Sequence, residues 1–143
     1  MKGETKMIQK QKGTPGFPAA AGVAFSLDGS APETTVLTAR ITGEIDHHAA
    51  RRLREEIDGE VFRTLPGTLT LDLSGVGFMD SAGLGLILGR LNLMTSRKGV
   101  LRLSGLRPPV ARILTLAGVE RLPGLILPDR EDEKPIGTPA AVN

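Results

Sequence analysis

The sequence predicts an α/β domain built on a mixed β-sheet of about four to five strands. Segments with the two-residue repeat of a strand alternate along the chain with segments that have the repeat of an amphipathic helix. Turn-forming residues separate these segments. The resulting order, β-β-α-β-α-β-α-β, requires parallel strand pairs, which right-handed crossovers through the helices would join.

The first half of this pattern consists of a hairpin followed by a helix. Residues 23–27 and 36–42 alternate apolar and polar side chains, and the turn sequence DGSAPE lies between them. Asp46 is a good N-cap for a helix over residues 47–63. The spacing of its apolar residues predicts one buried stripe, formed by Ala50, Leu53, Ile57 and Val61.

The second half alternates strands and helices. Residues 69–73 read as a strand that places Leu69, Leu71 and Leu73 on its inner face. A helix is expected over 81–96, with an apolar face of Leu84, Ile87, Leu88, Leu91 and Met94. Residues 100–104 form the next strand. A short helix then starts at two prolines and ends at Gly118, with Val110, Ile113, Leu114 and Ala117 buried, and residues 125–127 form the last strand.

Both ends of the chain lack such periodicity. The first 20 residues carry four lysines together with glycine and proline breakers, and the last 13 read EDEKPIGTPAAVN. We therefore predict a flexible N-terminal tail over 1–22, one domain over 23–128 and a flexible C-terminal tail over 129–143.

The composition excludes several functional classes. The chain has 143 residues, of which 40% are hydrophobic and 24% charged, as in ordinary globular domains. A net charge of +2 and the lack of Trp and Tyr argue against nucleic-acid binding. Cysteine is absent, which excludes disulfides and zinc–thiolate sites. No apolar run is long enough for a membrane span or a signal peptide, so we expect no membrane partner and a cytoplasmic location.

The start of the second helix is the candidate site. Residues 77–90 read GFMDSAGLGLILGR, although each glycine inside a helix costs about 1 kcal/mol relative to alanine. Ser81 would lie in the first turn, where backbone N–H groups are unpaired, with only Ala82, Gly83 and Gly85 around it. Another protein's active site could then reach its hydroxyl. The alternative is an ordinary helix start, in which Asp80 is a cap or a polar contact.

The same helix has a second apolar stripe opposite the first. It consists of Ala82, Leu86, Gly89 and Leu93, at positions where a helix covering a sheet normally shows polar residues. The stripe could pack against neighbouring helices or form an exposed patch for a partner. The sequence leaves both possibilities open.

Nucleotide, metal and hydrolase sites find little support. The glycines at 83–89 lie inside a helix, and no acidic residue follows at the distance that a dinucleotide-binding turn requires. His47 and His48 are adjacent, so on a helix they point about 100° apart and cannot serve one metal or one nucleophile well. The spacing of Asp46, Asp72 and Asp80 matches no metal loop. We expect no enzyme activity, no catalytic residue, no cofactor and no metal.

The segment GFMDSAGLGLILGR, with TGEIDHH at 42–48 before it and SGLRPPVARILTLAGVERL at 104–122 after it, resembles the STAS domain of bacterial anti-sigma factor antagonists. The resemblance covers about residues 23–128 and is strongest to the sporulation type. It implies the STAS fold, with helices on one side of the sheet. It also implies a switch protein that takes part in the regulation of transcription.

In that family, the unphosphorylated antagonist binds an anti-sigma factor that is also a serine kinase, and the sigma factor is released. The resemblance implies that this kinase phosphorylates Ser81, which ends binding, and that a serine phosphatase reverses the reaction. The glycines would keep the helix start bare for the kinase. The implied partner-binding residues are Gly43, Glu44, Asp46, His47, Met79, Asp80, Ala82, Gly83, Leu84, Gly85 and Leu86. The alternative is a STAS module that binds a small ligand, or scaffolds a stress or lipid-transport complex, without phosphorylation.

Overall fold

A computed structural model describes the backbone of residues 6–10 and all atoms of residues 21–127. These residues form six strands, three α-helices and two short 3₁₀ helices. The strands are β1 (Lys6–Lys10), β2 (Gly22–Asp28), β3 (Val36–Thr42), β4 (Thr68–Gly75), β5 (Val100–Ser104) and β6 (Leu125–Ile126). The helices are α1 (His47–Thr64), α2 (Ser81–Ser96) and α3 (Pro108–Ala117), with η1 (Pro32–Thr34) and η2 (Val119–Arg121) as the 3₁₀ turns.

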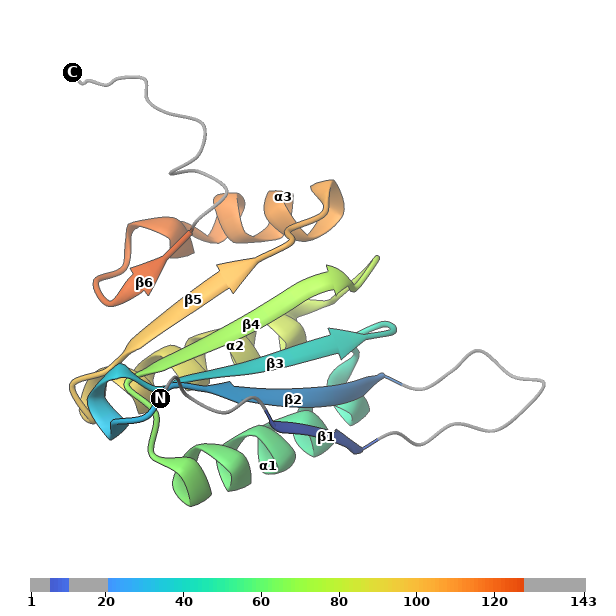
Figure 1. The fold of residues 1–143 in the computed structure, drawn as a ribbon. Helices are drawn as coiled ribbons and strands as arrows, with labels where there is room; N and C mark the ends of the chain where they lie inside the picture. Colours follow the sequence, from blue (N-terminus) through green and yellow to red (C-terminus); the bar gives the residue numbers. More distant parts are fainter. Residues whose placement is uncertain (1–5, 11–20, 128–143) are drawn as a thin grey trace.

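The strands form one mixed sheet in the order β1-β2-β3-β4-β5-β6 (Figure 1). β1 and β3 both run antiparallel to β2, whereas the β3–β4, β4–β5 and β5–β6 pairs are parallel. Each parallel pair is joined through a helix, as the alternating pattern predicted. The predicted α/β class and mixed sheet are thus confirmed.

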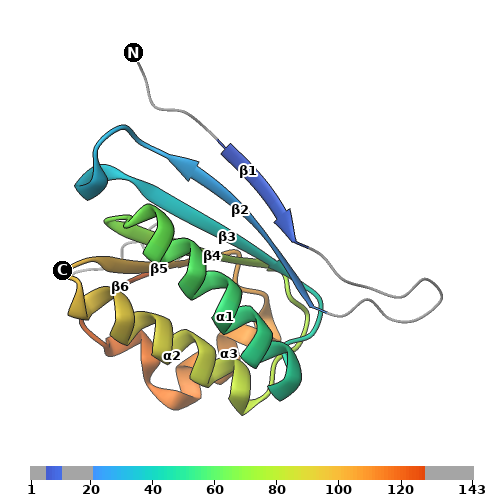
Figure 2. The same ribbon diagram turned by 90° about the horizontal axis from the view of Figure 1, so that it is seen from below.

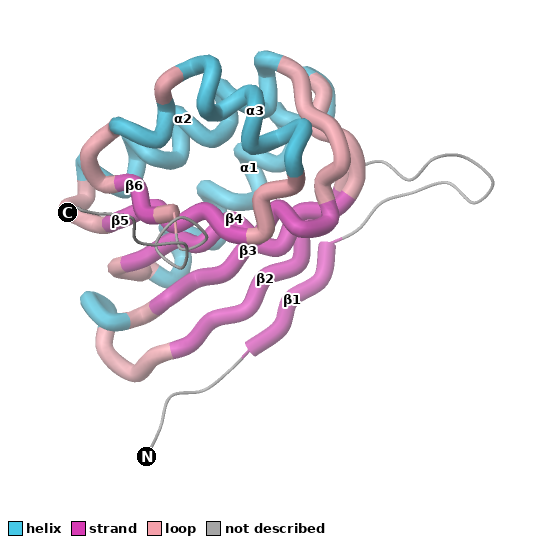
Figure 3. The backbone as a smooth tube through the Cα atoms, turned by 90° about the horizontal axis from the view of Figure 1, so that it is seen from above, coloured by secondary structure: helices cyan, strands magenta, loops and turns pink. Residues whose placement is uncertain are grey.

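All three α-helices lie on one face of the sheet (Figures 2 and 3). The core fills the space between them and the sheet. Leu69, Leu71 and Leu73 of β4 are fully buried there, as the alternation predicted. The predicted stripe of α1 is likewise buried, because its spacing turns all four side chains towards the sheet and α2. Among the described residues, no helix has the length and apolar character that crossing a bilayer would need.

The prediction of a flexible tail over residues 1–22 is wrong for two parts of that range. Lys6–Lys10 forms β1, which pairs with β2 from Lys6 opposite Leu27 to Lys10 opposite Val23. The domain also begins earlier than predicted, since Ala21 is buried and β2 starts at Gly22. Backbone hydrogen bonds hold an edge strand, so it needs no apolar repeat that a sequence would show. The remaining tail predictions, over 1–5, 11–20 and 129–143, lie outside the described residues.

The apolar face predicted for α2 is only partly correct. Ile87, Leu91 and Met94 are buried, but Leu84 is half-buried and Leu88 is 36% exposed. Leu86, from the opposite stripe, is only 4% exposed. The reason is that α2 packs on the sheet and also beside α1, so its buried surface is wider than one stripe (Figure 2). Similarly, Ala117 at the end of α3 is exposed rather than buried.

Candidate functional site

The candidate site lies where the parallel strands β3 and β4 end and the helices α1 and α2 begin. Two loops meet there, residues 43–46 after β3 and residues 76–80 after β4. The Ile45 N–H donates to the Phe78 carbonyl over 3.1 Å, and the Ile45 carbonyl accepts from the Asp80 N–H over 3.2 Å. The Gly43 N–H donates to the Gly75 carbonyl over 3.1 Å. These hydrogen bonds join the two loops into one surface.

Each loop ends in an aspartate that caps the following helix. The Asp46 Oδ1 accepts from the Ala49 N–H over 2.9 Å, and the Asp80 Oδ1 accepts from the Ala82 N–H over 2.8 Å. The backbone hydrogen bond from Ala49 lowers the pKa of Asp46; loss of hydration opposes this effect, and the nearby histidines add to it. Both caps pair N–H groups that would otherwise have no partner in the helix. The predicted cap at Asp46 is therefore confirmed, and Asp80 is a cap as well.

Ser81 is the first residue of α2 and its side chain is exposed. Because Asp80 caps the helix, the Ser81 hydroxyl is not needed for that purpose. Within the part of the chain that the structure describes, this hydroxyl makes no hydrogen bond. It is thus available to a reactant that approaches from solvent.

Exposed side chains of several kinds lie on the two loops and at the start of α1. Glu44 and His47 are exposed on the first loop and at the start of α1, where the His47 and His48 rings lie 4.1 Å apart between centroids. Phe78, on the second loop, is 48% exposed. Sequence reasoning missed Phe78, because an apolar residue next to buried Met79 reads as part of the core. An exposed phenylalanine beside polar residues is typical of a protein-binding surface.

Three of the eleven residues implied as partner contacts are buried instead. Met79 is fully buried, Gly83 is buried below it and Leu86 packs between α1 and α2. Met79 and Gly83 thus offer no surface to a partner, whereas Leu86 can be reached only from the space between α1 and α2. The residues that keep accessible atoms are Gly43, Glu44, Asp46, His47, Asp80, Ala82, Leu84 and Gly85.

The glycines of α2 have different structural roles. A Cβ atom at Gly83 would lie 2.7 Å from Met79 Cβ, closer than atoms can pack. Gly83 is therefore explained by close packing and not by access to Ser81. At Gly85 and Gly89, by contrast, no atom lies within 4 Å of an added Cβ. These two glycines leave open space beside the helix.

The third aspartate considered as a metal ligand, Asp72, belongs to a different cluster. It accepts hydrogen bonds from the Ser74 N–H over 3.0 Å and the Ser74 hydroxyl over 2.8 Å, and it pairs with Arg40 over 3.2 Å. Burial raises the pKa of Asp72, but these contacts outweigh burial and lower the pKa below its usual value. Across residues 21–127, no three His, Asp or Glu side chains gather in a way that could hold a metal ion.

Comparison with known proteins decides the family. The family model described as "STAS domain" matches residues 31–132, which is most of the chain. The chain belongs to the STAS domain family. Within the matched range lie both loops, both aspartate caps and Ser81.

Relatives of this STAS domain protein have regulatory names. The anti-sigma F factor antagonist of Paenibacillus polymyxa is 37% identical over 87 residues, which cover 61% of this chain and 74% of the relative. The protein of the same name from Lysinibacillus sphaericus is 34% identical over 95 residues, covering 66% and 80%. These proteins are named as regulators and not as enzymes.

Solved structures agree with this result. The anti-sigma factor antagonist SpoIIAA in its unphosphorylated form is 29% identical, with a TM-score of 0.59 over 76% of this chain and 90% of that one. The Bacillus cell fate determinant SpoIIAA in its phosphorylated form is 28% identical, with a TM-score of 0.54 over 76% and 94%. The STAS fold implied by the sequence is confirmed.

Proposed function

We propose that this protein is an anti-sigma factor antagonist that is controlled by phosphorylation of Ser81. Its unphosphorylated form binds an anti-sigma factor that is also a serine kinase, and the sigma factor is thereby released. The exposed, unpaired Ser81 hydroxyl at the start of α2 carries this proposal. The names of the relatives support the general role, and SpoIIAA is a relative that exists in unphosphorylated and phosphorylated forms. Such a role places the protein in the cytoplasm.

The site suits phosphoryl transfer from a partner kinase. The serine oxygen must approach the γ-phosphorus of ATP in line with the leaving group, and catalysis consists mainly of positioning. Here the hydroxyl is held at a helix start fixed by the Asp80 cap, and Gly85 leaves space one turn further along. The protein itself would contribute position and access, while the kinase would supply ATP, metal and base.

The phosphate would change the charge of the surface and leave its fold intact. It adds about −1.5 to −2 charge at neutral pH. On α2 itself the positive end of the helix dipole favours that charge. In an interface the same charge must lose its water and meet the acidic groups of a kinase site, which opposes binding. Removal of the phosphate by a serine phosphatase would restore the binding form.

The proposal is tested with a serine-kinase anti-sigma factor from the same genome and ATP. Intact-mass measurement should show one added phosphate on the wild type and none on Ser81→Ala, with the fold and partner binding of that variant retained. Ser96→Ala is the matched control, because Ser96 is an exposed serine at the opposite end of α2. Phosphate on Ser81→Ala, or tight binding without any phosphorylation, would instead favour an unphosphorylated STAS module that binds a small ligand or scaffolds a complex.

A further inference from the structure

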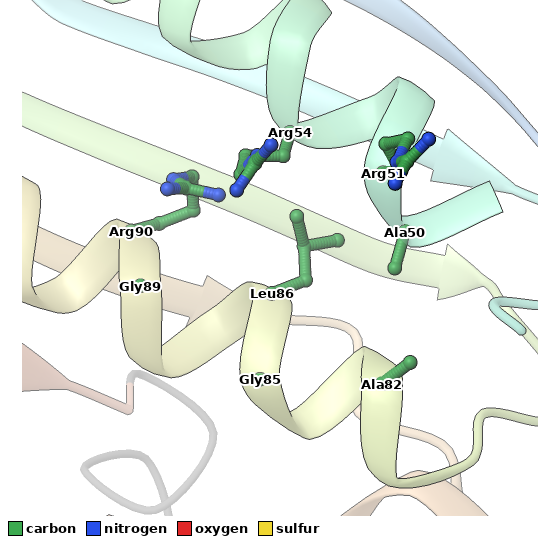
Figure 4. Close-up of a pocket in the computed structure, with 8 residues that line it drawn as sticks. All are labelled: Ala50, Arg51, Arg54, Ala82, Gly85, Leu86, Gly89 and Arg90. Atoms are coloured by element: carbon green, nitrogen blue, oxygen red, sulfur yellow. The ribbon is translucent and has the colours of Figure 1, made fainter. Parts of the chain in front are cut away.

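A groove of about 360 Å³ runs between α1 and α2, next to Ser81. Its walls come from both helices, as Figure 4 shows. The lining residues are Ala50, Arg51 and Arg54 from α1, and Ala82, Gly85, Leu86, Gly89 and Arg90 from α2. Leu86 closes the floor, and the two glycines add no side chain to it. The groove is thus open because small residues line it, and its charged groups are arginines.

Arg90 is an unusual residue for this position, because its side chain is only 7% exposed. Its Nε lies 2.9 Å from Asp58 Oδ1, which forms an ion pair on one side of the guanidinium. Its Nη1 is buried and makes no hydrogen bond to any residue that the structure describes. Buried polar groups in folded proteins nearly always have a partner. Arg90 therefore adds a buried positive charge to the wall of the groove, while Arg51 and Arg54 are exposed arginines that a ligand could reach.

The charges around Arg90 are predominantly positive. Burial lowers the pKa of Arg90, Asp58 opposes this effect, and the charge of the nearby Arg54 adds to it. Figure 4 shows the side chains of Arg54 and Arg90 pointing towards each other across the groove. Arg51 is exposed one turn earlier on α1. Asp58 pairs with Arg90 and also interacts with Arg54, so two of the three arginines share this one acidic residue.

We propose that this groove binds an acidic segment of the anti-sigma factor. Arginine pairs with carboxylates through two parallel hydrogen bonds, which suits aspartate and glutamate side chains. The groove follows α2 from Ala82 to Arg90, about two helical turns, so it fits an extended segment better than a single ion. This inference rests on the proposed function, because a partner that reaches Ser81 would also cover the groove.

The groove would also help the phosphate act as a switch. Ala82, the residue after Ser81, lines one end of it. A phosphate on Ser81 would bring negative charge to that end. It would repel an acidic segment and compete with it for Arg51, the fifth residue of α1. Release would then follow from direct competition for the arginines, in addition to the cost of desolvating the phosphate.

The test measures the Kd of the unphosphorylated protein for the same serine-kinase anti-sigma factor. Arg54→Glu and Arg51→Glu should each weaken binding about ten-fold or more at low salt. Arg112→Glu makes the same charge change at an exposed site on α3 and should stay within about two-fold of the wild type. Binding by the wild type should weaken more with added salt than binding by Arg54→Glu. Circular dichroism and melting curves check that the variants are folded.

The outcomes separate the two proposals. If the wild type binds and is phosphorylated on Ser81, but both groove variants bind as Arg112→Glu does, only the groove assignment is wrong. If the wild type neither binds nor accepts phosphate, the proposed function fails and this inference fails with it.

Inorganic phosphate is titrated as a second probe. If phosphate binds the wild type but not Arg54→Glu, while partner affinity is unchanged, the groove is a small-anion site and the proposal is overturned.

Discussion

Alanine substitutions at Gly83 and Gly85 should have opposite effects on stability. At Gly83 the new Cβ would lie 2.7 Å from Met79 Cβ and 2.9 Å from Met79 Sδ. Met79 Cβ is fixed to the backbone and cannot rotate away, so overpacking should cost about 1–3 kcal/mol. The gain in helix propensity, about 1 kcal/mol, offsets part of this. The net change is a loss of up to about 2 kcal/mol.

At Gly85 the same substitution meets no atom within 4 Å. The helix-propensity gain should then appear almost in full, as about 1 kcal/mol of added stability. The two variants differ in position by two residues and are identical in composition. Their stabilities should differ by about 1–3 kcal/mol, with Gly85→Ala the more stable.

Urea unfolding followed by circular dichroism gives both free energies of unfolding. Equal stability of the two variants would refute the argument that Gly83 is required by Met79. The rate of phosphorylation adds a second readout. Gly85→Ala should slow phosphorylation of Ser81 although the protein is more stable, because its methyl group projects into open space near the hydroxyl. An unchanged rate would mean that Gly85 has no part in kinase access.

Two further predictions concern packing and charge. Leu86→Ala should lower the free energy of unfolding by about 2–5 kcal/mol, since Leu86 is 4% exposed; an unchanged urea midpoint would show that this side chain is not packed. The lowered pKa of Asp72 means that its carboxylate stabilises the fold above about pH 4 and that this contribution is lost as pH falls through the folded-state pKa. Asp72→Asn should therefore reduce stability at pH 7 and flatten the acid side of the pH–stability curve, and curves of equal slope would contradict this.

The sequence predicted the α1 side of the core well and the α2 side poorly, for a physical reason. α1 meets the sheet along one stripe, so Leu53 and Ile57 can be recognised from spacing alone. α2 is apolar on nearly all sides and has two neighbours, so spacing cannot tell which leucine is exposed. Leu88 was assigned to the core for this reason, and the burial of Arg90 could not be expected from its residue type.

At the candidate site, the sequence predicted where the helix starts better than it predicted which distant residues contact each other. The Asp80–Ser81 helix start was found because capping is a local effect of neighbouring residues. The pairing of Ile45 with Met79 joins segments that are far apart in the chain, and no local pattern signals it. For the same reason, no local pattern predicts that Met79 is buried or that a groove lies between α1 and α2.

The hydrogen-bonded pair of loops has a consequence for partner choice. Ile45 and Met79, which hold the loops together, are fully buried, whereas Glu44 and Phe78 beside them point outward. Within the same short loops, the buried residues therefore hold the structure together and the exposed residues are left to contact a partner. A cell with several such antagonists could change the outward residues to keep each one with its own anti-sigma factor, at little risk to folding. Specific pairing of each antagonist with its own partner would then require substitutions at only a few exposed positions.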